Sequence, residues 1–213
     1  MKLPTLVYTI APFNTSDNRL HPAVIFLHGR GTDENDLLGL AAGFDPRFLI
    51  ASIRAPYRFR YGGYAWFELS DTGTVDINQV LESRDALLRC IVDILQNYPV
   101  DPQRIFLFGF SQGAMMSLTV SLSQPEKFRG VAAHSGMLLQ HEQLFYQWNA
   151  LTPVSFFIAH GTQDPVVPVV SGRQTHQRLL EAKANVLYHE YPIQHTISED
   201  SIHDIAAWMQ DLI

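Results

Sequence analysis

Short uninterrupted apolar segments recur along this chain, and each ends near a glycine, proline or histidine. Residues 23–27 end at His28-Gly29, for example, and residues 105–108 end at Gly109. Segments of this length without polar alternation are typical of strands buried on both faces, as in a parallel sheet covered by helices. We expect such strands at residues 23–27, 48–53, 105–108, 131–133, 154–159 and 186–191.

Helical patterns lie between these segments and after the last one. Strands that alternate with helices predict an α/β fold with a mainly parallel central sheet flanked by helices. A chain of 213 residues suits one domain, residues 1–213. The ligand site of such sheets lies beyond the carboxyl ends of the strands. The expected helices cover residues 80–98, 112–123 and 171–183, and a last helix begins after a cap at Ser198.

Composition narrows the function classes. Hydrophobic residues make up 46% and charged residues 17%, typical of a globular chain, and the formal net charge is −6. An acidic balance opposes non-specific attraction to nucleic acid or anionic lipid. The single cysteine, Cys90, excludes an intrachain disulfide and indicates a reducing compartment. With no signal-peptide pattern and no apolar run of about 18 residues, we expect a cytoplasmic protein without stable membrane insertion and without a nucleic-acid partner.

Residues 109–113 read Gly-Phe-Ser-Gln-Gly, the one Gly-x-Ser-x-Gly sequence of the chain. The motif follows a predicted strand and precedes a predicted helix, which is the context in which it presents a nucleophilic serine. The turn from strand to helix is so sharp that side chains two residues before and after the serine would collide, which favours Gly109 and Gly113. We predict that Ser111 is the nucleophile; the alternative is a glycine-rich turn that holds an incidental serine.

A serine nucleophile needs a base, and the base needs an orienting carboxylate. In this type of fold the chain order is serine, then Asp or Glu, then His. Asp164 follows the strand expected at residues 154–159, whereas the later candidate aspartates fall in the last helix. His195 lies between the last strand and the last helix. We predict Asp164 as the orienting acid and His195 as the base, with no metal and no cofactor.

Acyl transfer also needs donors for the oxyanion that develops on the carbonyl oxygen. The backbone N–H of Gln112, directly after the nucleophile, is one expected donor. The other comes from the loop after an early strand, where His28-Gly29-Arg30-Gly31 stands. We assign this second donor to the backbone N–H of Arg30.

Four segments carry a resemblance: Leu27-His28-Gly29-Arg30-Gly31, Trp66-Phe67-Glu68, residues 109–113 and residues 160–168. Together they resemble the phospholipase/carboxylesterase family of small α/β-hydrolases, which includes acyl-protein thioesterases. The likeness runs in the right order from residue 23 to residue 195. It implies an α/β-hydrolase fold without a lid domain, a Ser-Asp-His triad, and acyl substrates of short to medium chain length.

Two positions depart from the family's thioesterases. These tend to read Gly-Leu-Gly-Asp where this chain has Gly29-Arg30-Gly31-Thr32, and Gly-Gly after the Ser-Gln pair where it has Gly113-Ala114. The departures bear on protein-thioesterase activity more than on ester hydrolysis.

Residues 54–70 form an aromatic stretch after the second strand. One interpretation is a wall of the substrate pocket, to which Trp66 and Phe67 contribute; the other is a loop that packs its own aromatic rings. Arg54, Arg58 and Arg60 lie in the same stretch, and binding of an anionic group of the substrate is one hypothesis for their role.

The leading functional hypothesis is a serine hydrolase that cleaves carboxylic esters through an acyl-enzyme, with thioesters and lysophospholipids as further substrate classes. One alternative is a binding protein that kept the fold without catalysis, although binding alone does not need all three triad groups. Another is an acyltransferase that uses an alcohol in place of water. The oligomeric state stays open, a homodimer included.

Overall fold

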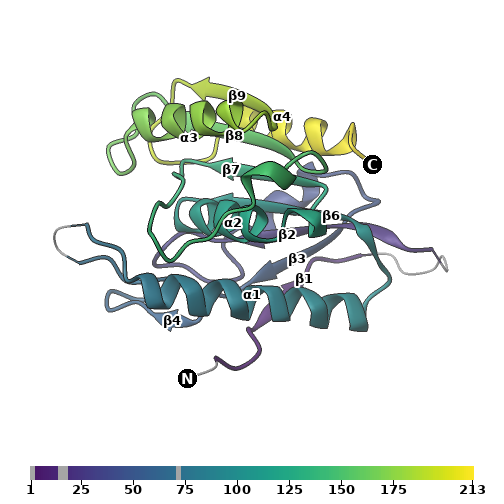
Figure 1. Cartoon of the computed structure of the whole chain (residues 1–213). Coiled ribbons are helices and arrows are strands. Elements are labelled where there is room, and N and C mark those ends of the chain that lie inside the picture. Colours follow the sequence, from purple (N-terminus) through teal and green to yellow (C-terminus); the bar gives the residue numbers. More distant parts are fainter. Residues whose placement is uncertain (1–2, 14–18, 71–72) are drawn as a thin grey trace.

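The computed structural model describes residues 3–13, 19–70 and 73–213. Within these residues seven strands form one sheet in the order β1-β3-β2-β6-β7-β8-β9 (Figure 1). Every pairing is parallel except that of β1 with β3. The strands are β1 (Tyr8–Ile10), β2 (His21–Leu27), β3 (Leu49–Ile53), β6 (Val100–Phe110), β7 (Gly130–His134), β8 (Ser155–Gly161) and β9 (Asn185–Tyr191).

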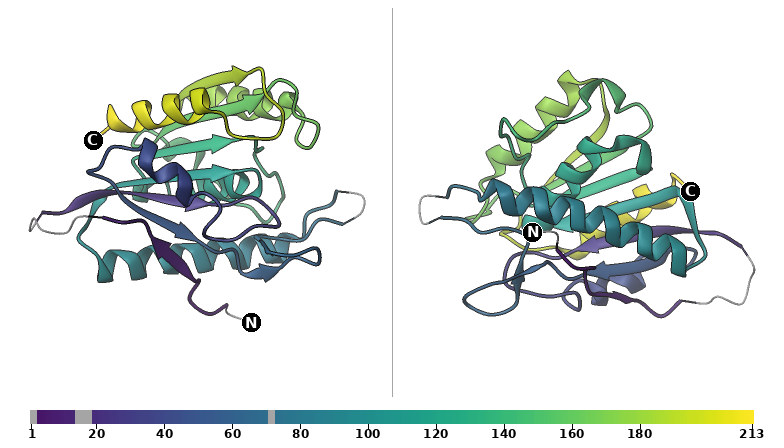
Figure 2. Two further views of the ribbon diagram at one scale, coloured as in Figure 1. Left: turned by 180° about the vertical axis from the view of Figure 1, so that it is seen from behind. Right: turned by 60° about the horizontal axis from the view of Figure 1, so that its bottom comes forward.

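Helices cover both faces of the sheet, so the expected α/β-hydrolase architecture is confirmed. Figure 1 shows α1, α2 and α3 in front of the sheet, and Figure 2 shows α4 and the short helix η1 on the opposite face. The α-helices are α1 (Ile77–Asn97), α2 (Gln112–Ser123), α3 (Val169–Glu181) and α4 (Glu199–Gln210), and the 3-10 helices are η1 (Leu38–Gly43), η2 (Pro125–Lys127) and η3 (Trp148–Ala150).

Two hydrophobic cores follow from this arrangement, because successive residues of a strand point to opposite faces of the sheet. In β2, Ile25 packs into the core under α1 and α2, whereas Phe26 packs into the core under α4 and η1. Residues 112–122 of α2 are all buried, which explains why this helix carries no charged residue on any side. The central strands are therefore buried on both faces, as their uninterrupted apolar sequence predicts.

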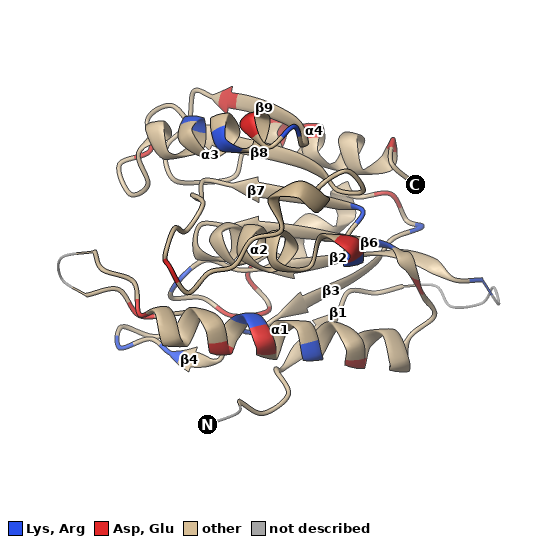
Figure 3. Ribbon diagram, viewed as in Figure 1, with Lys and Arg blue, Asp and Glu red and all other residues tan. Residues whose placement is uncertain are grey.

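The helix boundaries agree closely with the sequence. The range predicted for α2 is confirmed at both ends. The predicted cap of α4 is also confirmed: Ser198 accepts from the N–H of Ser201, and the Ser201 hydroxyl accepts from the N–H of Ser198 in a capping box. α3 begins at Val169, two residues before the predicted start. Acidic and basic residues are interspersed along α1 (Figure 3).

Two features were not predicted. β1 is a half-buried edge strand of three residues, too short to give a pattern. A small hairpin, β4 (Tyr57–Arg58) and β5 (Tyr64–Ala65), lies in the aromatic stretch.

Between β7 and β8 the chain forms only loops and η3, so no lid domain is inserted there. Among the described residues, no helix is long and apolar enough to cross a membrane.

The turn from β6 to α2 brings backbone segments into very close approach. Ser111 has φ 56° and ψ −118°, a strained conformation for a residue with a side chain. A Cβ at Gly109 would lie 2.3 Å from the carbonyl oxygen of Gly113, as expected. A Cβ at Gly113, however, would lie 1.9 Å from the carbonyl oxygen of Leu27. Gly113 is thus required chiefly by the approach of α2 to β2.

This approach predicts that Gly113→Ala destabilises the fold strongly. The clash is with the backbone of β2, an interior strand of the sheet, which cannot rotate away, so we expect a loss of about 3 kcal/mol or more in the free energy of unfolding, measured by urea denaturation. Gly43→Ala is the matched control, since a Cβ there has no neighbour within 4 Å. Equal stability of the two variants would contradict the prediction.

Candidate active site

Three of the residues singled out in the sequence converge at the carboxyl ends of the strands. Ser111 stands between β6 and α2, Asp164 follows β8, and His195 lies between β9 and α4. His195 Nε2 lies 3.0 Å from Ser111 Oγ, and His195 Nδ1 lies 2.7 Å from Asp164 Oδ2. Ser111 and His195 are 84 residues apart in the sequence, so only the tertiary fold brings them together.

The carboxylate of Asp164 is held by its own loop. Its Oδ1 accepts from the N–H of Val166 and of Val167, both at 2.8 Å, which leaves Oδ2 for His195. Burial alone would raise the pKa of Asp164, but the hydrogen bonds from His195, Val167 and Val166 outweigh it, and the pKa is lowered. Asp164 is therefore a preorganised anion in the folded protein.

This carboxylate dictates the tautomer of His195. A carboxylate only accepts hydrogen bonds, so Nδ1 of a neutral His195 carries the proton and donates to Asp164. Nε2 is then free to accept from the Ser111 hydroxyl. The His195 side chain is 16% exposed and lies against the Phe110 ring, with ring centroids 4.9 Å apart.

The turn after β2 approaches the serine closely. A Cβ at Gly29 would lie 3.5 Å from the Cβ of Ser111. Gln112 is the first residue of α2, so its N–H has no acceptor within the helix. Among the described residues, no acceptor takes the N–H of Arg30. Both backbone donors named from the sequence thus belong to segments that meet at Ser111.

His28 holds this turn in place, a role that the sequence did not reveal. Its Nδ1 donates to the carbonyl oxygen of Gly29 at 2.6 Å, and its Nε2 accepts from the N–H of Ala55 at 3.0 Å. Burial lowers the pKa of His28, which favours the neutral ring that these two bonds require. A histidine directly after a buried strand was the available signal.

The burial of Trp66 and Phe67 favours the second interpretation of the aromatic stretch, a loop that packs its own rings. Both side chains are fully buried and pack in the core under α1 and α2, so they do not form a wall open to substrate. Trp66 Nε1 donates to the carbonyl oxygen of His28. The side chain of Gln112 accepts from the N–H of Trp66 and donates to the carbonyl oxygen of Phe67, which joins this segment to the start of α2.

The three arginines of the aromatic stretch have different surroundings. Arg54 forms a bidentate ion pair with the buried Glu34 and lies over the ring of Tyr64. Arg58 also lies over Tyr64, and Arg60 lies over Tyr61. Arg54 thus has a structural partner that the sequence did not suggest, because Glu34 is 20 residues away.

One cavity opens directly at His195. Its volume is 240 Å³, and its wall contains both polar and apolar side chains, one of them acidic. It lies between the loop before α4 and the segment that leads into η1. The lining residues are Asp36, Leu37, Leu40, Phe110, His195, Thr196 and Ile197.

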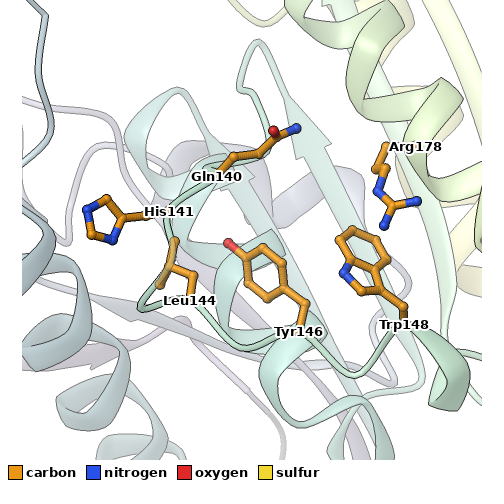
Figure 4. A pocket seen from close by; sticks show the side chains of 6 residues that line it. All are labelled: Gln140, His141, Leu144, Tyr146, Trp148 and Arg178. Carbon is orange, nitrogen blue, oxygen red and sulfur yellow. The ribbon is translucent and has the colours of Figure 1, made fainter.

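A second cavity, of 210 Å³, contains none of the predicted site residues (Figure 4). The guanidinium of Arg178 covers the Trp148 ring there, 4.2 Å from its centroid. Cys90 is buried in α1, and burial raises the pKa of its thiol to about 12, which makes it a poor nucleophile. Within the described part of the chain, no group of three or more His, Cys, Asp or Glu side chains could hold a metal ion.

Comparison with known proteins also indicates an enzyme that cleaves esters. Residues 10–213 match the family model described as Phospholipase/Carboxylesterase. This chain belongs to the phospholipase/carboxylesterase family. It is accordingly a hydrolase of the esterase and thioesterase type, with the α/β-hydrolase fold.

Several curated relatives are acyl-protein thioesterases. The chain is 32% identical over 166 residues to "Acyl-protein thioesterase 1" of Debaryomyces hansenii, covering 71% of this chain and 70% of that protein. It is 33% identical over 231 residues to the protein of that name from Aspergillus fumigatus, and the match covers 95% of this chain and 93% of that protein.

Solved structures agree in fold. The structure of esterase PE8 has a TM-score of 0.86 and 25% identity, and the match covers 99% of this chain and 100% of that one. The Bacillus cereus carboxylesterase has a TM-score of 0.84 at 22% identity, and the match covers 98% of this chain and 95% of that one.

The lowered pKa of Asp164 predicts how stability depends on pH. Such a carboxylate stabilises the fold above its unfolded pKa of about 3.9, and the contribution is lost as the pH falls through the lower folded value. Asp164→Asn keeps an oxygen for Val166 and Val167 but cannot ionise. We expect the wild type to lose its advantage over the variant in free energy of unfolding between about pH 7 and about pH 3. Urea denaturation at both pH values measures this, and an advantage that grows on acidification would contradict it.

Proposed function

We propose that this protein hydrolyses carboxylic esters and thioesters of short to medium acyl chains through an acyl-enzyme on Ser111. The observation that carries the proposal is the hydrogen-bonded series Ser111–His195–Asp164 at the carboxyl ends of the strands. Family membership supports ester and thioester cleavage as the reaction. Residues 1–213 act as one α/β-hydrolase domain in the cytoplasm, without a cofactor.

Acylation begins when Ser111 Oγ attacks the carbonyl carbon of the substrate. His195 Nε2 takes the hydroxyl proton as the Oγ–C bond forms, and Asp164 stabilises the resulting imidazolium without itself taking a proton. The tetrahedral intermediate then collapses, His195 returns the proton to the departing alcohol or thiol, and Ser111 remains acylated.

Deacylation repeats the sequence with water. His195 Nε2 removes a proton from the water as it attacks the acyl carbon, and the proton then passes to Ser111 Oγ when the ester bond breaks. The products are a carboxylic acid and the free enzyme. An acyltransferase would use an alcohol in place of this water, with the same residues.

The oxyanion of each tetrahedral intermediate needs fixed donors. We assign the backbone N–H groups of Gln112 and Arg30. The close approach of Gly29 to Ser111 supports the assignment, as do the absence of an intrahelical acceptor for Gln112 and the fixing of the turn by His28. A non-catalytic binder would have no use for this combination of donors, base and carboxylate.

The cavity at His195 limits the size of the group that it can bind. An enclosed apolar cavity of about 150 Å³ holds benzene; by that measure 240 Å³, although open to solvent here, suits a linear group of about six to eight carbons. Leu37, Leu40 and Ile197 supply apolar contacts. The proposed substrates therefore carry short or medium chains, and the names of the fungal relatives support thioesters as one class of them.

The proposed base and nucleophile predict a specific pattern of activity loss. A fluorophosphonate should label the protein once, at Ser111. His195→Ala should remove nearly all turnover of a soluble ester, and adding Ser111→Ala should cost little more, because these groups act as one unit. Asp164→Asn should lower kcat by about 10⁴-fold by favouring the wrong tautomer of the base.

The matched control is His203→Ala, because His203 is exposed on α4, eight residues beyond His195. It should retain wild-type kcat and KM. Full activity of His195→Ala or Asp164→Asn, or a fluorophosphonate adduct on another residue, would refute the proposed mechanism.

A second kinetic prediction concerns chain length. With 4-nitrophenyl esters, kcat/KM should rise with chain length and then fall beyond about eight carbons, when the chain exceeds the cavity. Leu40→Trp, which fills the cavity, should move the optimum to shorter chains. Without a lid there should be no jump in rate at a lipid interface. A preference for long-chain emulsions with such a jump would count against this substrate class.

A further inference from the structure

His134 is a buried histidine that the mechanism above does not use. It is the last residue of β7 and has no solvent exposure. Its Nδ1 lies 3.0 Å from Ser135 Oγ, and its Nε2 lies 3.0 Å from Ser201 Oγ. Burial lowers its pKa to about 3, so the ring is neutral and has one donor and one acceptor nitrogen.

The hydrogen bonds of Ser201 favour Nε2 of His134 as the nitrogen that donates. The Ser201 hydroxyl donates its single hydrogen to the carbonyl oxygen of Ser198 and accepts from the N–H of Ser198. His134 Nε2–H therefore donates to Ser201 Oγ, and Nδ1 accepts from the Ser135 hydroxyl. Every polar atom of the ring is satisfied in this direction, and such networks favour a single arrangement of their members.

This ring contacts both ends of the loop that carries His195. The loop follows Tyr191, the last residue of β9, and ends at Ser198, the cap of α4. The Tyr191 ring is stacked with the His134 ring: the ring centroids are 6.4 Å apart, and the angle between the ring planes is 11°. At the other end, the bond to Ser201 attaches the capping box of α4 to β7.

The same residue also contacts the nucleophile's side of the site. The carbonyl oxygen of His134 accepts from the N–H of Ser111 at 3.0 Å. The Phe110 ring lies against both His134 and His195, with ring centroids 5.8 Å and 4.9 Å away. His134 is thus connected to the serine through its backbone and to the loop of the base through its side chain.

We propose that His134 is a positioning residue, which sets the separation of Ser111 and His195 by joining the end of β7 to the start of α4. The proposal rests on the proposed function, in which a proton passes between those two side chains. A misplacement of about 1 Å between reacting groups can cost about 10²-fold in rate. His134 does not line the 240 Å³ cavity. We therefore expect a substitution of His134 to lower kcat and to leave substrate binding unchanged.

Two substitutions of similar chemistry separate positioning from filling of space. In His134→Gln the amide nitrogen reaches the place of Nε2 and can donate to Ser201; in His134→Asn the shorter side chain cannot. We expect His134→Asn to lower kcat by about 10- to 100-fold with KM within about twofold, and His134→Gln to recover most of the loss. Rates are measured with a soluble ester and divided by the sites that a fluorophosphonate titrates.

Met209→Ala is the control for lost stability. Met209 is fully buried in α4 but belongs to the apolar core and not to the network. It should lower the unfolding temperature while leaving kcat per titrated site unchanged. If His134→Asn does not fold, Ser201→Ala takes its place, because it removes the partner of Nε2 while leaving the ring.

NMR of the wild type tests the network without reference to activity. With ¹⁵N-labelled histidine, His134 should carry its proton on Nε2 and should not titrate between about pH 5 and about pH 8. The opposite tautomer, a titrating ring, or wild-type kcat in His134→Asn or Ser201→Ala would overturn the positioning role. An inactive wild type that no fluorophosphonate labels would instead overturn the proposed function, and the positioning role with it.

Discussion

The close approach of α2 to β2 is the constraint on which the rest of the site depends. It forces the chain to turn from β6 into α2 within one residue, and it places Ser111 in a conformation with positive φ. Such strain costs about 1–3 kcal/mol and persists only where the surroundings enforce it. Here the burial of residues 112–122 supplies the enforcement, since α2 lies entirely within the hydrophobic core. The same turn exposes the serine hydroxyl and directs the first N–H groups of the helix to one place.

The polar groups around this turn differ in how deeply they are buried. Asp164 is buried and bonded to two backbone N–H groups, whereas His195 is partly exposed and lies on a loop. The carboxylate is thus the fixed end of the series, and the histidine, which lies between it and Ser111, is partly open to solvent. Buried neutral histidines surround them: His28 holds the turn after β2, and His134 joins β7 to α4. Their burial lowers the pKa of both rings, which keeps additional positive charge away from His195.

The sequence was sufficient for the order of the main strands and helices and for the residues that converge, for a physical reason. Strands buried on both faces have uninterrupted apolar sequences, and in a parallel sheet the residues after their carboxyl ends must meet. Contacts that depend on tertiary distance could not be predicted in this way. The partner of His134 is 67 residues away, and nothing near Ser201 marks it. The sequence left two interpretations of Trp66 open, because an aromatic residue of a buried segment and one of a pocket wall look alike in sequence. β1 was missed because three half-buried residues show no period.

The sheet order has a consequence for the time at which the site comes into being. β2 and β6 are neighbours near the middle of the sheet, and the segment up to α2 already contains the strained turn with its serine. Asp164 and His195 arrive only with β8, β9 and the docking of α4, which are the last elements along the chain. In a chain synthesised from its N-terminus, Ser111 is therefore present before Asp164 and His195. Under the proposed mechanism, reactivity toward esters therefore requires the C-terminal half of the sheet as well as the turn that holds Ser111.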